Sequence, residues 1–336
     1  MAANKPVTIG DVTVAPGQSA AINLPIADLY TGASLSMPVK VFNGRKAGPV
    51  LFVAAAIHGD ELNGVEIIRR LLRQKSLRSL SGTLLAVPVV NVHGFLERSR
   101  YLPDRRDLNR SFPGSAKGSI AARTANTFVT EIVSKADYGI DLHTGAVNRA
   151  NLPQVRANLD DEKTLELAEV FGAPVIISSS ISDRSLRQYA AENDFPMLVY
   201  EAGEALRHDE VSIRAGLRGV KRVMRHIGML PKIRESKPIV PVVADATVWV
   251  RAPASGIVSH KLALGETVVE GQRLAVVSDP LGEAQEKVEA PFDGIVIGRS
   301  TLPLAYEGEA LFHVAAFKSL SRAESKVEQF TAKISE

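Results

Sequence analysis

The feature that most constrains the fold is an uninterrupted apolar run, LFVAAAI at residues 51–57, which ends abruptly at His58, Gly59, Asp60 and Glu61. A run this apolar, bounded by Gly48-Pro49 and a polar turn, predicts a buried strand of a parallel sheet. The carboxyl ends of such strands present the following side chains to a crevice. The apolar spacing over residues 61–74 predicts a helix directly after the turn, with Asp60 as its N-cap.

His58 and Glu61 have the H-x-x-E spacing that can bring an imidazole nitrogen and a carboxylate oxygen to one metal ion. Catalytic zinc uses three such protein ligands and keeps a further position open. His143 is the best candidate for the third ligand, because it follows a short apolar strand at residues 138–142 and would emerge at the same sheet edge. Taken alone, H-x-x-E is a common accidental pattern, and a histidine after a strand is more often a core residue with satisfied hydrogen bonds.

Residues 98–114 (RSRYLPDRRDLNRSFPG) hold five arginines among prolines and aspartates and show no periodicity, which predicts a loop. The simplest interpretation is a solvated basic loop. However, a planar guanidinium can bind a carboxylate through two hydrogen bonds, and an adjacent asparagine can donate to the same anion. The loop is therefore a candidate for binding an anionic substrate.

Four motifs occur in a characteristic order: HGDE at 58–61, RDLNR at 106–110, DLHTG at 141–145, and a strand-terminal E-x-G that begins at Glu201. Together they resemble the succinylglutamate desuccinylase and aspartoacylase family, a branch of the zinc carboxypeptidase superfamily, over roughly residues 50–228. The resemblance implies one zinc ion with the ligands His58, Glu61 and His143. It also implies a catalytic carboxylate at Glu201 and contacts to the substrate carboxylate from Asn109 and Arg110.

Two assignments within this site stay open. Arg100 and Arg106 compete for the role of polarising the scissile carbonyl, since the spacing to Asn109 differs among relatives. Glu204 competes with Glu201 as the general base, a role that suits a carboxylate leaving a buried strand toward a cationic centre; the E-x-G context favours Glu201. Asp107 is expected to hold the loop or to orient a histidine ligand. Three other histidines are not expected to bind metal: His93, His260 and His313.

Composition excludes several kinds of site. The 336 residues include no cysteine, so disulfides, iron–sulfur clusters and thiol catalysis are excluded, and metal ligands must be His, Asp or Glu. The formal charge of +3 is spread along the chain without a basic tract, so neither a nucleic acid nor a membrane is an expected partner. No stretch approaches the ~18 apolar residues of a spanning helix and the N-terminus has no apolar h-region, so we expect a cytoplasmic protein.

Strand patterns alternate with helix patterns over residues 47–232, which predicts an α/β catalytic domain with a mostly parallel twisted sheet and helices on both faces. Residues 1–46 contain short alternating segments that predict antiparallel strands leading into this sheet. The polar segment at residues 151–160 lies where relatives have a variable, substrate-shaping loop. Residues 233–245, rich in Pro, Lys and Val, have the composition of a linker.

An internal repeat follows the linker. RAPASGIVSHKLALGETVVEGQRLAVV and EAPFDGIVIGRSTLPLAYEGEALFHVA align at three pairs of positions: Ala252 with Ala290, Gly256 with Gly294, and Leu274 with Leu311. The pair predicts a small all-β barrel-sandwich over residues 246–317, followed by a tail over 318–336. This domain resembles biotinyl and lipoyl carrier domains, but Lys287 lacks a Met-Lys-Met or Asp-Lys-Ala setting, so we expect no attached cofactor. We expect the domain to wall the catalytic cleft or to form a homo-oligomer contact.

The expected function is zinc-dependent removal of an acyl group, such as acetyl or succinyl, from an N-acyl amino acid or a related small carboxylate. A metallocarboxypeptidase acting on peptides is the first alternative, since it would use the same zinc and base but would need an open cleft. A non-catalytic binding protein is the second alternative. It would be expected to lack a ligand or the base, whereas all four positions are present here.

Overall fold

The computed structural model describes residues 2–178, 182–233, 239–260 and 262–335. Residues 51–55 of the apolar run lie in β5 (Lys46–Ala55), at the centre of the main sheet. β5 pairs in parallel with β6 (Ser81–Val87) and with β7 (Tyr138–Gly145), and β7 pairs in parallel with β10 (Met197–Glu204). The carboxyl ends of β5, β7 and β10 therefore meet at one edge of the sheet.

Antiparallel strands flank this parallel centre. On one side β6 is followed by β4 (Ser34–Asn43) and β3 (Ser19–Asp28), and β1 (Val7–Ile9) and β2 (Val12–Val14) form a separate hairpin. On the other side β10 pairs with β8 (Arg149–Arg156), beside which β9 (Val175–Ile177) and β11 (Val242–Ala244) run in parallel.

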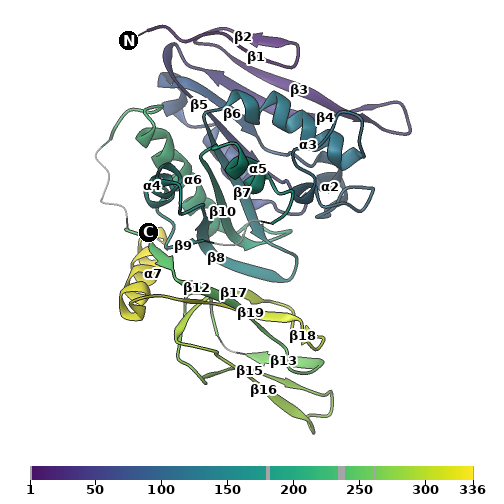
Figure 1. Cartoon of the computed structure of the whole chain (residues 1–336), viewed down its shortest axis with the longest axis vertical. Helices are drawn as coiled ribbons and strands as arrows, with labels where there is room; N and C mark the ends of the chain where they lie inside the picture. The colour runs from purple at the N-terminus through teal and green to yellow at the C-terminus, as the bar shows by residue number, and fades with distance from the viewer. Residues whose placement is uncertain (1, 179–181, 234–238, 261, 336) are drawn as a thin grey trace.

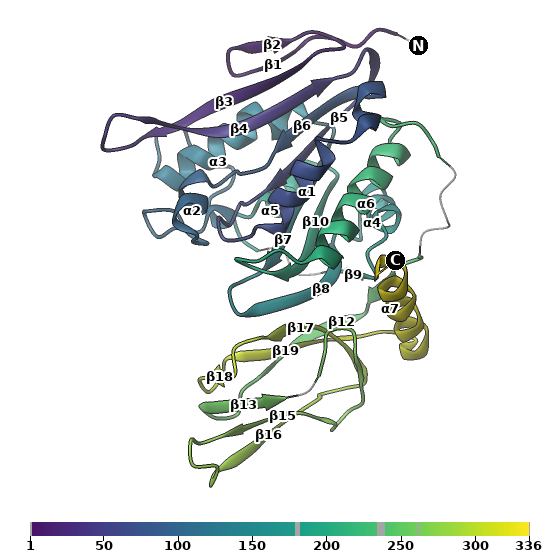
Figure 2. The ribbon, with the colours of Figure 1, turned by 180° about the vertical axis from the view of Figure 1, so that it is seen from behind.

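Helices cover both faces of the sheet (Figures 1 and 2). One layer contains α1 (Asn63–Leu71), α4 (Glu162–Phe171) and α6 (Glu210–His226), and the other contains α2 (Val92–Glu97), α3 (Ile120–Glu131) and α5 (Leu186–Glu192). Leu51 and Val53 pack against the first layer, whereas Phe52 and Ala54 pack against the second. Both faces of β5 are buried, which is why the run is continuously apolar. The predicted fold class is confirmed.

The described residues of the C-terminal barrel-sandwich form eight strands: β12 (Ala246–Arg251), β13 (Gly256–His260), β14 (Thr267–Val268), β15 (Arg273–Ser278), β16 (Gln285–Glu289), β17 (Gly294–Ser300), β18 (Leu304–Ala305) and β19 (Ala310–Ala316). The two repeated glycines, Gly256 and Gly294, begin β13 and β17. A Cβ atom at either position would lie about 2.3 or 2.4 Å from a backbone carbonyl oxygen, that of Ser278 or that of Ala315. The repeat therefore preserves glycine where two backbones approach too closely for a side chain.

The main sheet continues from the α/β domain into the barrel-sandwich. β17 pairs in an antiparallel manner with β8, with Gly298 opposite Asn151 and Ser300 opposite Arg149. The sheet order is thus β12-β19-β17-β8-β10-β7-β5-β6-β4-β3, and Figure 2 shows the lower domain joined to the upper one along this edge. The C-terminal domain is hydrogen-bonded to the strand next to β10.

Four local expectations are corrected by the structure. The segment expected as a loop at residues 151–160 forms most of β8, because Leu152 and Val155 are buried in the sheet while Asn151 and Arg156 line a pocket. The expected tail contains α7 (Leu320–Ser335), whose Phe330 and Ile334 pack against the layer of α4 and α6.

The second half of the expected linker forms β11, whereas residues 234–238 of it lie outside the described residues. Asp60 is not the N-cap of the first helix. That helix begins at Asn63 with Leu62 as N-cap, because residues 58–61 form a turn in which the carbonyl of Asp60 accepts a hydrogen bond from Leu206.

Candidate active site

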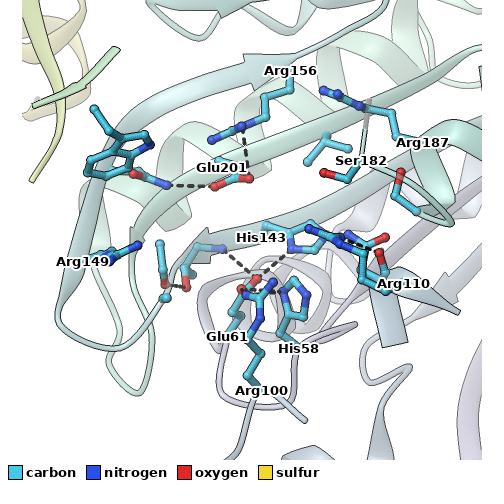
Figure 3. A pocket seen from close by; sticks show the side chains of 18 residues that line it. His58, Glu61, Arg100, Arg110, His143, Arg149, Arg156, Ser182, Arg187 and Glu201 are labelled. Atoms are coloured by element: carbon cyan, nitrogen blue, oxygen red, sulfur yellow. Dashed lines mark hydrogen bonds and ion pairs between the residues drawn. The ribbon is translucent and has the colours of Figure 1, made fainter. Parts of the chain in front are cut away.

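Three potential metal ligands meet at the carboxyl edge of the parallel strands. His58 and Glu61 lie in the turn after β5, and His143 lies inside β7. All three are buried, and one potential ligand atom from each lies within 4.8 Å of the other two. The predicted ligands are therefore brought together by the sheet, as Figure 3 shows.

The ring orientations of the two histidines are fixed by carboxylates. Nδ1 of His58 lies 2.7 Å from Oε1 of Glu61, and Nδ1 of His143 lies 2.8 Å from Oε2 of the same residue. On the far side of each ring, Nε2 of His58 lies 3.2 Å from Asp107 and Nε2 of His143 lies 2.7 Å from Asp141. Carboxylates in this position orient metal-binding imidazoles and raise their basicity. The Nδ1 atoms of both histidines therefore lie beside the carboxylate of Glu61.

The carboxylates around His143 favour its protonated form, and the imidazoles around Glu61 favour its ionised form. Burial alone would lower the pKa of His143, but the carboxylates of Asp141 and Glu61 raise it well above its usual range. Burial would raise the pKa of Glu61, but the two adjacent imidazoles hold it well below the usual range. Two imidazoles and one carboxylate, buried and oriented in this way, fit the donor set of a catalytic zinc ion.

The cluster opens into a cavity of about 230 Å³, part of whose wall comes from the arginine-rich loop at residues 98–114. Arg100, Asn109 and Arg110 line it. Arg100 lies 3.0 Å from Asp107 and 3.2 Å from Nδ1 of His58. Arg106 does not line the cavity, and its mostly exposed side chain lies 3.7 Å from Asp104.

The two candidate bases lie in different environments. Glu201 lines the cavity and stands opposite His143 in the parallel register between β10 and β7. Glu204 is buried outside the cavity, where its carboxylate accepts hydrogen bonds of 3.1 Å from the backbone of Asn148 and from the hydroxyl of Thr301. Glu204 therefore joins the β7–β8 turn to the C-terminal domain.

Several residues in the cavity wall were not anticipated from the sequence. They come from β8, α5 and the C-terminal domain: Arg149, Asn151, Arg156, Arg187 and Trp249. Burial and the neighbouring Arg156 lower the pKa of Arg187. The Trp249 ring stacks on His313 with 4.6 Å between centroids, and the guanidinium carbon of Arg149 lies over the Trp249 ring, 5.5 Å from its centroid. The polar residues within 149–156 were the sequence signal for this part of the cavity wall. Their polarity favoured the prediction of a loop over that of a strand.

A sheet whose central strands are parallel, with two imidazoles, a carboxylate and a facing glutamate at their carboxyl edge, is an arrangement suited to metal-assisted hydrolysis. Residues 47–227 match the model of the succinylglutamate desuccinylase/aspartoacylase catalytic domain. The chain belongs to this family, which confirms the resemblance drawn from the motifs.

The similarity to individual relatives extends beyond the catalytic domain. The chain is 28% identical over 292 residues to N-alpha-acetyl-L-2,4-diaminobutyric acid deacetylase of Halomonas elongata, covering 83% of this chain and 85% of that protein. The product-bound ectoine utilization protein EutE (DoeB) of Ruegeria pomeroyi superposes with a TM-score of 0.80 at 25% identity, covering 89% of this chain and 95% of the other.

A succinylglutamate desuccinylase from Silicibacter sp. TM1040 also has a TM-score of 0.80, at 24% identity, covering 90% of this chain and 95% of the other. This likeness concerns the fold alone. Within the residues described, the structure contains no helix with the length and apolar character needed to cross a membrane.

Proposed function

We propose that the protein is a zinc-dependent deacylase that hydrolyses the amide bond of an N-acyl amino acid or a related small carboxylate. The observation that carries this proposal is the position of Glu201, which faces the cluster of His58, Glu61 and His143 across a small cavity lined by arginines. When bound by these three ligands, zinc would supply Lewis-acid stabilisation of charge on oxygen and would lower the pKa of a water molecule.

The chain's own residues account for the remaining chemistry. Glu201 accepts a proton from the attacking water molecule while the oxygen of that water adds to the amide carbonyl carbon. Arg100, which lies beside the ligand cluster, donates to the carbonyl oxygen as negative charge develops there. Glu201 then returns the proton to the amide nitrogen, the carbon–nitrogen bond breaks, and a carboxylic acid and a free amine leave. Arg106 is not assigned a role in this scheme, because it lies outside the cavity.

The composition of the cavity supports an anionic substrate. Two carboxylates, those of Glu61 and Glu201, line it together with five arginines: Arg100, Arg110, Arg149, Arg156 and Arg187. Asn109 and Arg110 are adjacent on the short 3-10 helix Leu108–Arg110, so an amide and a guanidinium can bind one carboxylate together. The relative from Halomonas elongata, named as a deacetylase of an acetylated amino acid, supports the same substrate class.

The alternative function is that of a metallocarboxypeptidase. Such an enzyme needs an open cleft for the part of the peptide upstream of the scissile bond. Trp249 of the C-terminal domain forms part of the cavity wall, which supports a short substrate instead. A screen of the zinc-loaded protein should measure amine release from acetyl, succinyl and formyl derivatives of amino acids, including N-alpha-acetyl-L-2,4-diaminobutyrate. Glu201→Gln protein serves as the blank. Activity on peptides alone would establish the carboxypeptidase reading, and metal-independent activity would remove zinc from the proposal.

A further inference from the structure

We infer that Asn151 and Arg156 are positioning residues that hold the carboxylate of Glu201 toward the metal ligands, and that the C-terminal domain fixes the strand that carries them. This inference rests on the proposed function, in which Glu201 is the base. It gives a positioning role to residues of β8, a strand that lies outside the four motifs that resemble the family.

Each carboxylate oxygen of Glu201 has its own partner on β8. Oε2 accepts a hydrogen bond of 2.8 Å from Nδ2 of Asn151. Oε1 lies 3.2 Å from Nε of Arg156 (Figure 3). The Arg156 contact is an ion pair rather than an aligned hydrogen bond. Together the two partners restrict rotation of the carboxylate about its terminal bond, which a single partner would not do.

An irregularity in β8 makes this two-sided contact possible. Asn151 and Arg156 are five positions apart, so strict alternation along a strand would place them on opposite faces of the sheet. Between β10 and β8, Glu201 pairs with Gln154 and Gly203 pairs with Asn151, so β8 contains one residue more than β10 over this interval. An extra residue of this kind re-aims the following side chains, and here both partners reach the same carboxylate.

The C-terminal domain holds β8 from its other side. Gly298 of β17 lies opposite Asn151, and a Cβ atom at position 298 would approach Oδ1 of Asn151 to 3.0 Å and His313 Cβ to 3.1 Å. His313 lies close enough to Arg156 for that guanidinium to contribute to lowering the imidazole pKa, after the larger effect of burial. Packing this close leaves the strand little freedom to shift, so the partners of Glu201 are held at fixed positions.

Because proton transfer requires the carboxylate to be placed within hydrogen-bond reach of the water, misplacing it lowers the rate even when the substrate binds normally. With zinc-loaded full-length enzyme and the best substrate of the screen, Arg156→Ala should lower kcat about 10- to 100-fold with KM changed less than about two-fold. Arg156→Lys, which keeps the charge, should recover part of the loss. Arg123→Ala, which removes an exposed arginine of α3, is the matched control and should have wild-type kinetics.

Asn151 offers an independent test. Asn151→Asp has nearly the same shape but places a second negative charge against Glu201, so it should lose more activity than Asn151→Ala.

Added guanidinium ion should restore kcat of Arg156→Ala in a saturable manner, because the removed side chain faces the cavity. A merely structural defect would not respond to the added ion.

A double-mutant cycle decides whether Arg156 acts through Glu201. In the Glu201→Gln background, Arg156→Ala should cause no further loss of kcat. An equal loss in both backgrounds, or a rise in KM alone, would show that Arg156 contacts the substrate and would overturn the inference. A Glu201→Gln enzyme with normal kcat would instead refute the base assigned in the proposed function, so the two failures are distinguishable.

Discussion

Glu201 and His143 occupy paired positions on the adjacent parallel strands β10 and β7. Side chains at paired positions of neighbouring strands point to the same face of a sheet, so Glu201 faces the ligand cluster to which His143 belongs. Asp141 lies two residues before His143 on that face and accepts the hydrogen bond of its Nε2 atom. The sheet register alone thus places the proposed base, one proposed metal ligand and the carboxylate that orients its ring side by side.

We predict that His143→Ala releases the metal without unfolding the chain. The substitution leaves two ligands, and a catalytic zinc site requires three. Metal content after dialysis should fall well below one equivalent, while the metal-free protein should keep a cooperative unfolding transition. His208→Ala, which removes an exposed histidine, should retain its metal. A full equivalent retained by His143→Ala would make the ligand assignment wrong.

Asp141 should tune the affinity of the same site. Asp141→Asn keeps the shape of the side chain but removes the charge that accepts from His143 at 2.7 Å. Loss of such a partner typically weakens metal affinity by about 10- to 100-fold. Competition with a chelator of known zinc affinity measures the change. An unchanged affinity would show that the contact between Asp141 and His143 is not maintained in the metal-bound protein.

Glu201→Gln should separate chemistry from binding. Glutamine can still hydrogen-bond to the attacking water but cannot accept its proton, so kcat should fall at least ~10²-fold. Metal content and KM should change little, because Glu201 is not a proposed ligand.

Glu204→Gln is the matched comparison for Glu201→Gln. Glu204 is buried and joins Asn148 to Thr301. The substitution Glu204→Gln should therefore lower the free energy of unfolding, and its effect on kcat should be much smaller than that of Glu201→Gln. Near-normal kcat in Glu201→Gln, with a large loss in Glu204→Gln, would reverse the assignment.

Trp249→Ala should show whether the C-terminal domain shapes the substrate cavity. Removing the indole opens the wall next to Arg149, and we expect KM for a small acyl amino acid to rise roughly ten-fold, as for the loss of one buried aromatic contact. Trp249→Phe retains an aromatic ring to stack on His313 and should have a much smaller effect. Identical KM values in all three proteins would contradict a role for this wall in substrate binding.

His313 predicts how stability depends on pH at this domain junction. Burial and the nearby Arg156 lower its pKa to about 4. The unfolded chain, with a histidine pKa of about 6.5, binds more protons than the folded chain between these two values. Stability contributed by neutral His313 is therefore present above pH 6.5 and is lost as pH falls toward 4, by at most about 1.4 kcal/mol per pH unit.

The variant His313→Phe isolates this effect, because it preserves stacking on Trp249 and removes the titrating group. Urea unfolding of both proteins, equally zinc-loaded, at pH 7.5, 6.5 and 5.5 should give a difference that grows in favour of the variant as pH falls. Parallel stability curves would show that His313 binds protons equally in the folded and unfolded chains, so that folding does not lower its pKa.

The C-terminal domain should carry no covalent cofactor. Lys287 lies within β16, opposite Val276 of β15, rather than at the tip of a hairpin where carrier lysines are presented. After expression in cells that contain biotin and lipoate ligases, the intact mass should equal the sequence mass. An added biotinyl or lipoyl mass on Lys287 would contradict this prediction.

The sequence by itself determined the fold class and the identity of the metal-ligand candidates. A strand buried on both faces requires a continuous apolar run, and residues that end such a strand must emerge at the sheet edge. Both are local requirements, so His58, Glu61 and His143 are recognisable before any contact is known. The repeat in the C-terminal domain is equally local, since Gly256 and Gly294 meet the same backbone constraint twice.

The tertiary structure decided which side chains complete the cavity. The extra residue in β8 turns Asn151 and Arg156 toward Glu201, and strand pairing with β17 brings Trp249 to the cavity wall. It also separated Arg100, inside the cavity, from Arg106, outside it, and Glu201 from Glu204. These outcomes depend on register and on contacts between segments far apart in the chain, which no local pattern of residues encodes.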